Sequence, residues 1–343
     1  MCIRDRRFAP EGQIPLAPFL QVTFNQPMVP LATLEELSAE EVPVRLTPQI
    51  PGVWRWLGTK TLTFEYQGDN DRFPMATEYV AEIPAGTTSA TGGVLAETVT
   101  WKFSTPPPEV QTNYPDGGPQ LLEPLIFVAF NQRINPQAVL DTIELSAGNR
   151  TYALRLATQE EIEAHERVSR FVENAQEARW LAFRPQEPLP EATDFTVTVG
   201  PGTPSAEGPL TTGEAQTFNF STYSALRIEE SNCGWSGRDC PPYAPFFIRF
   251  NNPLNTEAFS EEMLQIEPEL PGAVVNVFGN SIEIRGASQG RTTYRVRLSG
   301  SIGDIFGQTL ESLMDRVSLD TEDLSHLNTL VSAAALFHSL PCL

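Results

Sequence analysis

Few residues in this chain of 343 could do chemistry. The histidines are His165, His326 and His338, and two of them lie near the C-terminal end. A serine or cysteine nucleophile usually needs a histidine beside it, and no Gly-x-Ser-x-Gly sequence is present to position one. Neither a Walker loop nor a Gly-x-Gly-x-x-Gly sequence occurs, so nucleotide binding lacks its usual signal. We therefore expect no catalytic site and interpret the chain as not an enzyme.

Two acidic stretches could bind a metal ion. Residues 69–71 (DND) and 115–118 (PDGG) offer carboxylate and carbonyl oxygens, which are the ligands that Ca²⁺ prefers. Neither stretch matches an EF-hand loop, and Asp beside Gly or Asn is the ordinary chemistry of turns. We predict turns at both places, and expect no metal site and no cofactor.

The cysteines could form a covalent link. Cys233 and Cys240 lie in the sequence NCGWSGRDCPP, whereas Cys2 and Cys342 lie near the two ends. The intervening loop is long enough to close through a disulfide, and the second Cys-x-x-Cys pair of a structural zinc site is absent. We predict a disulfide between Cys233 and Cys240, with two free thiols as the alternative. A disulfide would indicate an oxidising compartment, in agreement with export.

Two tryptophans could bind a sugar. Trp54 and Trp56 are separated by one residue in VWRWLG, so both indoles point to the same face of a strand. Such a pair could stack on carbohydrate, as in a carbohydrate-binding module. The interpretation that we favour is that both belong to the core of a β-sandwich.

Composition narrows the possible classes of protein. The 30 prolines and 23 glycines are spread along the chain, which indicates many short elements separated by turns. The net charge of −20 argues against binding nucleic acid or an anionic membrane, because clustered Lys and Arg would be needed. No apolar stretch is long enough for a transmembrane helix, so we expect no membrane insertion.

The elements that position these residues recur three times. The sequences FNQP (24–27), FNQR (130–133) and FNNP (250–253) each follow an apolar run. Each copy continues with a strand of alternating apolar residues, such as that from Tyr79 to Ile83, and then a Gly-rich loop. We interpret the Phe-Asn phrase as a strand end, since the proline present in two copies cannot donate to a β-ladder.

Alternation of apolar and polar residues gives a strand one buried face and one solvent-exposed face, which is typical of antiparallel strands in a sandwich. The three copies therefore predict an all-β chain of three tandem β-sandwich modules, at 10–106, 107–222 and 223–311. The proline triplet at 106–108 stiffens the first boundary.

The second module carries an insertion that the others lack. Thr158 and Glu161 fit a capping box, and the apolar residues that follow lie near helical spacing. The pattern predicts a single amphipathic helix over about 158–178. We expect it to lie on its own sandwich, with a docking surface for a partner as the alternative.

Several phrases together resemble a known family. FNQPMVPLATLEEL, WRWLGTKTLTFEY and CGWSGRDCPPYAPFFIRFNNPL are similar to the N-terminal region of bacterial alpha-2-macroglobulins, over about residues 10–311. The Phe-Asn strand end and the later Thr-x-Tyr strand also resemble bacterial Ig-like domains. This resemblance implies Ig-like sandwiches that serve as the non-catalytic scaffold of a protease-trapping inhibitor in the periplasm or at the cell surface.

The resemblance also implies which partners the protein would have, and two sequence features of the family are missing from this chain. The partners would be other domains of the full-length protein, together with the proteases that it traps. The chain contains no Cys-Leu-Glu-Gln thioester sequence and no recognisable bait segment. The alternative function is that of an S-layer-type surface protein whose Ig-like modules act as spacers or as carbohydrate- or protein-binding modules.

The two ends depart from the repeat. Residues 1–7 (MCIRDRR) resemble an adapter-derived start more than a native one, and no signal segment follows. Residues 312–343 lack the alternation that closes the first two modules. We therefore expect a fragment with an irregular C-terminal tail, in which the third module lacks its last strand and has an unpaired sheet edge.

Overall fold

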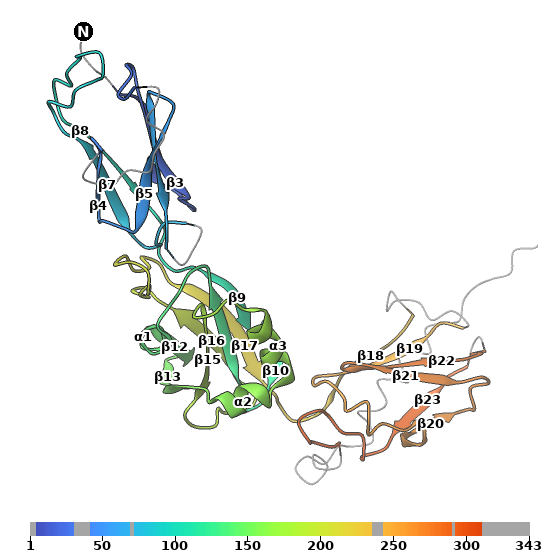
Figure 1. Cartoon of the computed structure of the whole chain (residues 1–343). Coiled ribbons are helices and arrows are strands. Elements are labelled where there is room, and N and C mark those ends of the chain that lie inside the picture. Colours follow the sequence, from blue (N-terminus) through green and yellow to red (C-terminus); the bar gives the residue numbers. More distant parts are fainter. Residues whose placement is uncertain (1–4, 31–41, 69–71, 235–242, 290–291, 311–343) are drawn as a thin grey trace, which may run out of the picture. The chain divides into compact units, whose positions relative to one another are not determined.

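The regular structure of the chain is almost entirely β, which confirms the predicted all-β class (Figure 1). The structure is a computed structural model. Turns and loops of different lengths separate many short strands, in agreement with the spread of proline and glycine along the sequence. It describes residues 5–30, 42–68, 72–234, 243–289 and 292–310.

The chain divides into two compact units. The larger unit contains the first group of strands and most of the second group. The smaller unit contains the third group and two short segments from earlier in the chain. The larger unit comprises 1–116, 124–187 and 195–219, and the smaller comprises 117–123, 188–194 and 220–343.

The first group of strands forms two four-stranded sheets with one hydrophobic core between them. All neighbouring strands are antiparallel except β2 and β8, which are parallel. One sheet has the order β1 (Asp5–Ala9), β3 (Phe19–Phe24), β6 (Thr61–Tyr66), β5 (Gly52–Leu57), and the other β2 (Gly12–Gln13), β8 (Val99–Ser104), β7 (Glu78–Ile83), β4 (Arg45–Thr47).

The alternation read from the sequence sets which side chains enter this core. Tyr79, Ala81 and Ile83 on β7 are all fully buried, whereas the residues between them are half-buried. Tyr79 stacks on Phe103 of β8 at a centroid separation of 4.9 Å. Burial of these large side chains from both sheets is the main favourable contribution to the fold.

The second group of strands also forms two sheets with buried residues between them. On β11, Ile126, Val128 and Phe130 are buried on one face, which leaves Phe127 on the other face. The sheets have the orders β14 (Leu154–Leu156), β15 (Trp180–Pro185), β11 (Ile126–Phe130), β9 (Val110–Tyr114) and β10 (Pro119–Gln120), β17 (Gln216–Thr222), β16 (Asp194–Val199), β12 (Ile143–Ala147), β13 (Arg150–Tyr152).

The helical insertion of this group is two helices rather than one. α2 (Gln159–Glu163) begins with the predicted capping box, in which Thr158 and Glu161 bond each other's backbone. The predicted single helix over 158–178 is wrong, because His165 leaves the helical conformation (φ −103°, ψ 95°) and caps α3 (Glu166–Asn174). A third helix, α1 (Pro136–Leu140), begins at Asn135, whose side chain accepts two backbone N–H groups.

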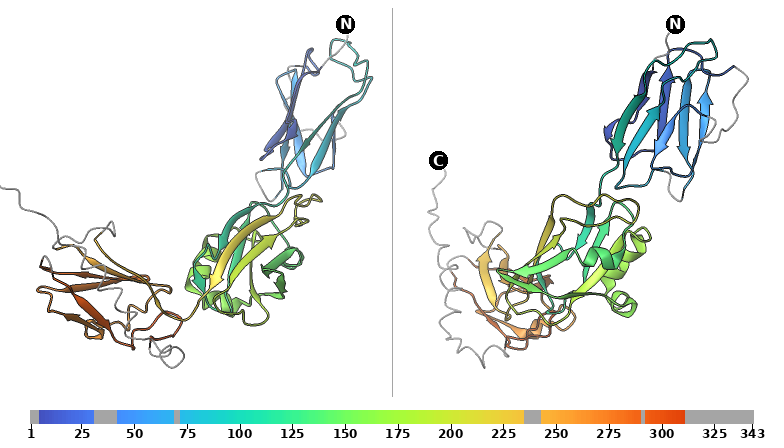
Figure 2. Two further views of the ribbon diagram at one scale, coloured as in Figure 1. Left: turned by 180° about the vertical axis from the view of Figure 1, so that it is seen from behind. Right: turned by 90° about the vertical axis from the view of Figure 1, so that its left-hand side faces the viewer.

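The two helices of the insertion lie against the outer face of the second group (Figure 2). Ile162 of α2 and Val168 of α3 are buried against Phe127 and Ala182 of the sheet. The expectation that the insertion lies on its own sandwich is therefore confirmed. Among the described residues, no helix has the length and apolar character needed to cross a bilayer.

The third group has one four-stranded and one two-stranded sheet around a shared core. Phe250, Ile282 and Ile284 are fully buried in the larger sheet, and Val296 is buried in the smaller one. A 3₁₀ helix, η1 (Glu261–Met263), leads into the smaller sheet. The orders are β18 (Ile228–Cys233), β19 (Phe246–Phe250), β22 (Ser281–Arg285), β21 (Val274–Phe278) and β20 (Leu264–Glu267), β23 (Arg295–Leu298).

The strand that closes the first two groups has an expected place in the third. β8 begins 16 positions after β7 ends, and β17 begins 17 positions after β16 ends. The same interval after β23 leads to about residue 314, which falls outside the described residues, as does the predicted tail at 312–343. The absence of a last strand therefore stays a prediction.

Candidate functional site

The recurring Phe-Asn phrase places a buried amide at its third position. Gln26, Gln132 and Asn252 are 7%, 0% and 1% exposed. Each follows a strand that ends in a buried phenylalanine, on β3, β11 and β19 respectively. A buried amide must find hydrogen-bond partners, because an unpaired one costs free energy. The third residue of the phrase therefore has a structural role of its own, in addition to marking the end of the strand.

In the first two groups the amide accepts hydrogen bonds from the Gly-rich loop. Ser89 Oγ donates to Gln26 Oε1 at 2.8 Å, and Thr91 Oγ1 lies 3.1 Å from the same oxygen. Ser205 Oγ donates to Gln132 Oε1 at 2.7 Å. These bonds tie the loop that follows the alternating strand to the end of a strand in the facing sheet.

The third group keeps this contact with its donor and acceptor exchanged. Asn252 Nδ2 donates to Asp304 Oδ2 at 2.8 Å, in a site where both residues are buried. Asp304 Oδ1 accepts the backbone N–H groups of Phe306 and Gln308, each at 2.9 Å. A backbone bond sets the same register in all three groups: Ala90 N to Pro27 O, Ala206 N to Arg133 O and Ile305 N to Pro253 O.

The second of these loops also carries a buried ion pair. Arg72 Nη1 donates to Glu207 Oε2 at 2.7 Å and Arg72 Nη2 donates to Glu207 Oε1 at 3.2 Å, with side-chain exposures of 8% and 0%. The N–H groups of Met75 and Arg133 donate to the same carboxylate at 3.0 and 2.8 Å. We call residues 72–77 and 205–210 together the Glu207 junction.

The protonation state of the junction follows from these bonds. Burial by itself raises the pKa of Glu207, but the hydrogen bonds from Arg72, Arg133 and Met75 outweigh burial and hold the pKa below its usual range. Arg179 lies nearby, and burial together with the positive charge of Arg72 lowers its pKa. Glu207 is therefore a carboxylate at neutral pH, held by donors on both sides.

At the centre of the Glu207 junction the backbone around Gly208 lies directly against the backbone of residues 75–76. A Cβ added at Gly208 would lie 2.1 Å from Thr77 Oγ1 and 2.3 Å from the carbonyl oxygen of Met75. The N–H of Leu210 donates to the carbonyl of Ala76 at 2.8 Å, and the N–H of Ala76 donates to that of Pro106 at 2.9 Å. No residue larger than glycine fits at position 208 without moving one of the two segments.

The described histidine, His165, caps a helix of the insertion. His165 Nδ1 accepts the N–H of Val168 at 3.3 Å, and the imidazole lies edge-on to Tyr114 at 5.5 Å between ring centroids. Burial lowers the pKa of His165, in agreement with a neutral ring that accepts a hydrogen bond. Arg167 lies over the Tyr114 ring at 4.9 Å from its centroid.

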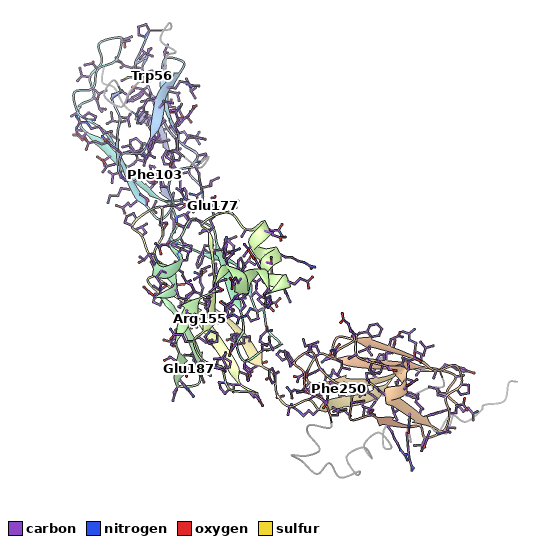
Figure 3. The ribbon with its side chains drawn as sticks, turned by 60° about the horizontal axis from the view of Figure 1, so that its bottom comes forward. Trp56, Phe103, Arg155, Glu177, Glu187 and Phe250 are labelled. Carbon is purple, nitrogen blue, oxygen red and sulfur yellow. The ribbon has the colours of Figure 1, made fainter. Side chains whose placement is uncertain are left out.

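Glu161 is the carboxylate most strongly stabilised in this insertion. Two Arg155 nitrogens donate to it at 2.8 and 2.6 Å, and the N–H of Thr158 donates at 2.9 Å. The hydrogen bonds from Arg155, followed by that from Thr158, lower the pKa of Glu161 to about 2. Figure 3 labels Arg155 on its strand. The arrangement fixes the start of α2 on the sheet.

The structure describes only some of the other candidate residues. Residues 69–71 and Cys240 lie outside the described residues. Cys233 is buried at the end of β18. Gly117 and Gly118 have positive φ angles of 117° and 70°, in agreement with the predicted turn at 115–118. Within the described ranges, no group of three or more His, Cys, Asp or Glu side chains is arranged to hold a metal ion.

The two tryptophans belong to the core. Trp54 and Trp56 are each 2% exposed, and Trp54 packs on Phe64 at 5.0 Å between ring centroids. The interpretation as core residues is confirmed, and the stacking of sugars on this pair is wrong because neither face is accessible. Sequence reasoning missed the amide–loop contacts, although the recurrence of Gln or Asn at one position was a signal for them.

Comparison with known proteins agrees with the resemblance found in the sequence. The chain is 24% identical over 93% of its length to an alpha-2-macroglobulin homolog from Nostoc sp., of which it spans 18%. It is 26% identical over 62% of its length to circularly permutated Ras protein 2 from Dictyostelium discoideum, of which it spans 6%. No protein-family profile matches the chain.

Two solved structures align with most of the chain at low TM-scores and low sequence identity. Domains A168–A170 of titin align over 90% of this chain and 94% of their own, with a TM-score of 0.32 and 10% identity. An Escherichia coli alpha-2-macroglobulin structure spanning domains MG0-NIE-MG1 aligns over 89% of this chain and 97% of its own, with a TM-score of 0.24 and 11% identity.

Proposed function

We propose that the chain is the N-terminal scaffold of an alpha-2-macroglobulin-like protease inhibitor. The observation that carries this proposal is the similarity to the Nostoc alpha-2-macroglobulin homolog along 93% of the chain. Because the chain spans only 18% of that protein, protease trapping would belong to a longer polypeptide. In that polypeptide this chain would act as a non-catalytic scaffold.

The use of its polar side chains supports a scaffold role. Glu207 and Asp304, two carboxylates with buried side chains, accept backbone N–H groups and pair with side chains of neighbouring segments. His165 caps a helix, and Gln132 holds a loop. Groups committed in this way to structural hydrogen bonds stabilise one geometry, whereas catalytic groups must face substrate.

The proposed partners are the remaining domains of the longer protein and the proteases that it traps. The proposed location is the periplasm or the cell surface. Export would expose the cysteines to an oxidising environment, so we propose that Cys233 pairs with Cys240. Peptide mapping of exported protein without reduction should find these two residues linked, and free thiols at both would contradict the pairing.

The DNA that flanks the coding sequence tests the proposal most cheaply. We expect the continuous reading frame to encode further sandwich domains, a bait segment and, in many such proteins, a thioester sequence. S-layer anchoring repeats in their place would contradict the proposal. They would indicate instead a surface protein in which the same modules act as spacers.

A further inference from the structure

The loop that carries Glu207 occupies an equivalent place in all three groups of strands. The backbone bonds from Ala90, Ala206 and Ile305 align the loops, so the next residue is Thr91 in the first, Glu207 in the second and Phe306 in the third. We call this residue the loop contact position. Its side chain differs in chemistry among the three groups, although the surrounding backbone is held in the same way.

In the second and third groups the side chain at the loop contact position touches a segment that comes earlier in the chain. Glu207 binds Arg72 and Met75 of the first group of strands, within the larger compact unit. Phe306 stacks on Tyr223, the residue after β17, at 4.8 Å between ring centroids, within the smaller unit. A charged pair and an aromatic pair thus serve the same place in two loops.

The energetics of a buried ion pair indicate what Glu207 contributes. Removing two charges from water offsets much of their attraction, so a buried pair often adds little net stability. Leaving one charge unpaired is costly, however, and four donors converge on this carboxylate from three directions. Such an arrangement favours one relative placement of the segments over all others.

We propose that Glu207 locks the first two groups of strands into one rigid element. The inference rests on the contacts of the Glu207 junction and is independent of the proposed function. Loss of Glu207 would release the joint and leave each sandwich folded, because Glu207 lies in the loop between β16 and β17 and in no strand of either sandwich.

Pulsed electron paramagnetic resonance tests this on the whole chain. Spin labels would be attached through an unnatural amino acid at Thr100 and Thr151, two exposed positions, one in each group. The parent protein should give one narrow distance distribution, and Glu207→Gln should lose it and give a broad one. The matched control is Glu78→Gln, which removes an exposed ion pair with Lys102 and should leave the distribution narrow.

A second variant separates loosening from unfolding. Gly208→Ala keeps every charge but places a methyl group against Thr77, so it should also broaden or shift the distribution. Hydrogen exchange at β7 and β16 should remain slow in both variants, which shows that the sandwiches are folded. If one of the two variants unfolds a sandwich, the distance distribution of the other variant decides the test. A narrow distribution like that of the parent protein in a folded variant overturns the proposal.

Discussion

The substitution Gln132→Ala tests the amide–loop contact in the second group of strands. It removes the acceptor of the Ser205 hydroxyl and the donor, at 3.1 Å, to the Pro106 carbonyl. The carbonyl keeps the N–H of Ala76, so the group that loses its acceptor is the Ser205 hydroxyl, whose oxygen still accepts the N–H of Glu207. An unsatisfied buried group costs about 1–3 kcal/mol, and the lost methylene adds about 0.8 kcal/mol. We expect a loss of about 2–4 kcal/mol.

The measurement is pulsed hydrogen exchange across a urea series, read by mass spectrometry on peptides from β11 and β17. The control is Gln137→Ala, which truncates an exposed glutamine bonded only to Asp141 and should cost less than about 0.5 kcal/mol. Equal urea midpoints for the two variants would refute the reasoning, because a buried amide would then contribute no more than an exposed one.

Three further results are expected. Trp54→Ala should destabilise the first group by about 3–5 kcal/mol, as a buried indole requires, whereas Leu57→Ala at an exposed position of the same strand should have little effect in urea unfolding. The pKa of Glu161 is lowered on folding to about 2, so the stability that its charge contributes is complete above about pH 4.3 and is lost as the pH falls toward 2. Hydrogen exchange of the α2 amides, measured over an acid titration, should show this loss. Unchanged protection of these amides would contradict it. The pKa of His165 is also lowered, so the unfolded chain binds its proton first and α3 should lose protection below about pH 6.5; His165→Asn, which caps without titrating, should remove that dependence.

Much of the fold could be predicted because local patterns are repeated. Period-two alternation from Tyr79 to Ile83 fixed one face of a strand, and the capping box at Thr158 fixed the start of a helix. The break between α2 and α3 was missed, since apolar spacing continues across His165 and only its side-chain cap interrupts the helix. Long-range partners carry no such local signal.

The Glu207 junction shows this limit most clearly. Arg72 and Glu207 are separated by 135 positions, and one sequence holds nothing that pairs them. The recurring amide was visible as FNQP, FNQR and FNNP, but its partner changes from Ser89 to Ser205 to Asp304. The phrase was interpreted as a strand end because its proline was evident, whereas the burial of Gln26, Gln132 and Asn252 depends on the facing sheet.

The central claim is that this chain provides the scaffold of a protease trap. A capture assay on the longer protein encoded at the same locus tests it most directly. With residues 10–311 present, the longer protein should block an endoprotease from cleaving a large protein substrate, and deletion of these residues should abolish the block. The chain by itself should not inhibit. Full inhibition after the deletion, or none by the intact protein, would contradict the account.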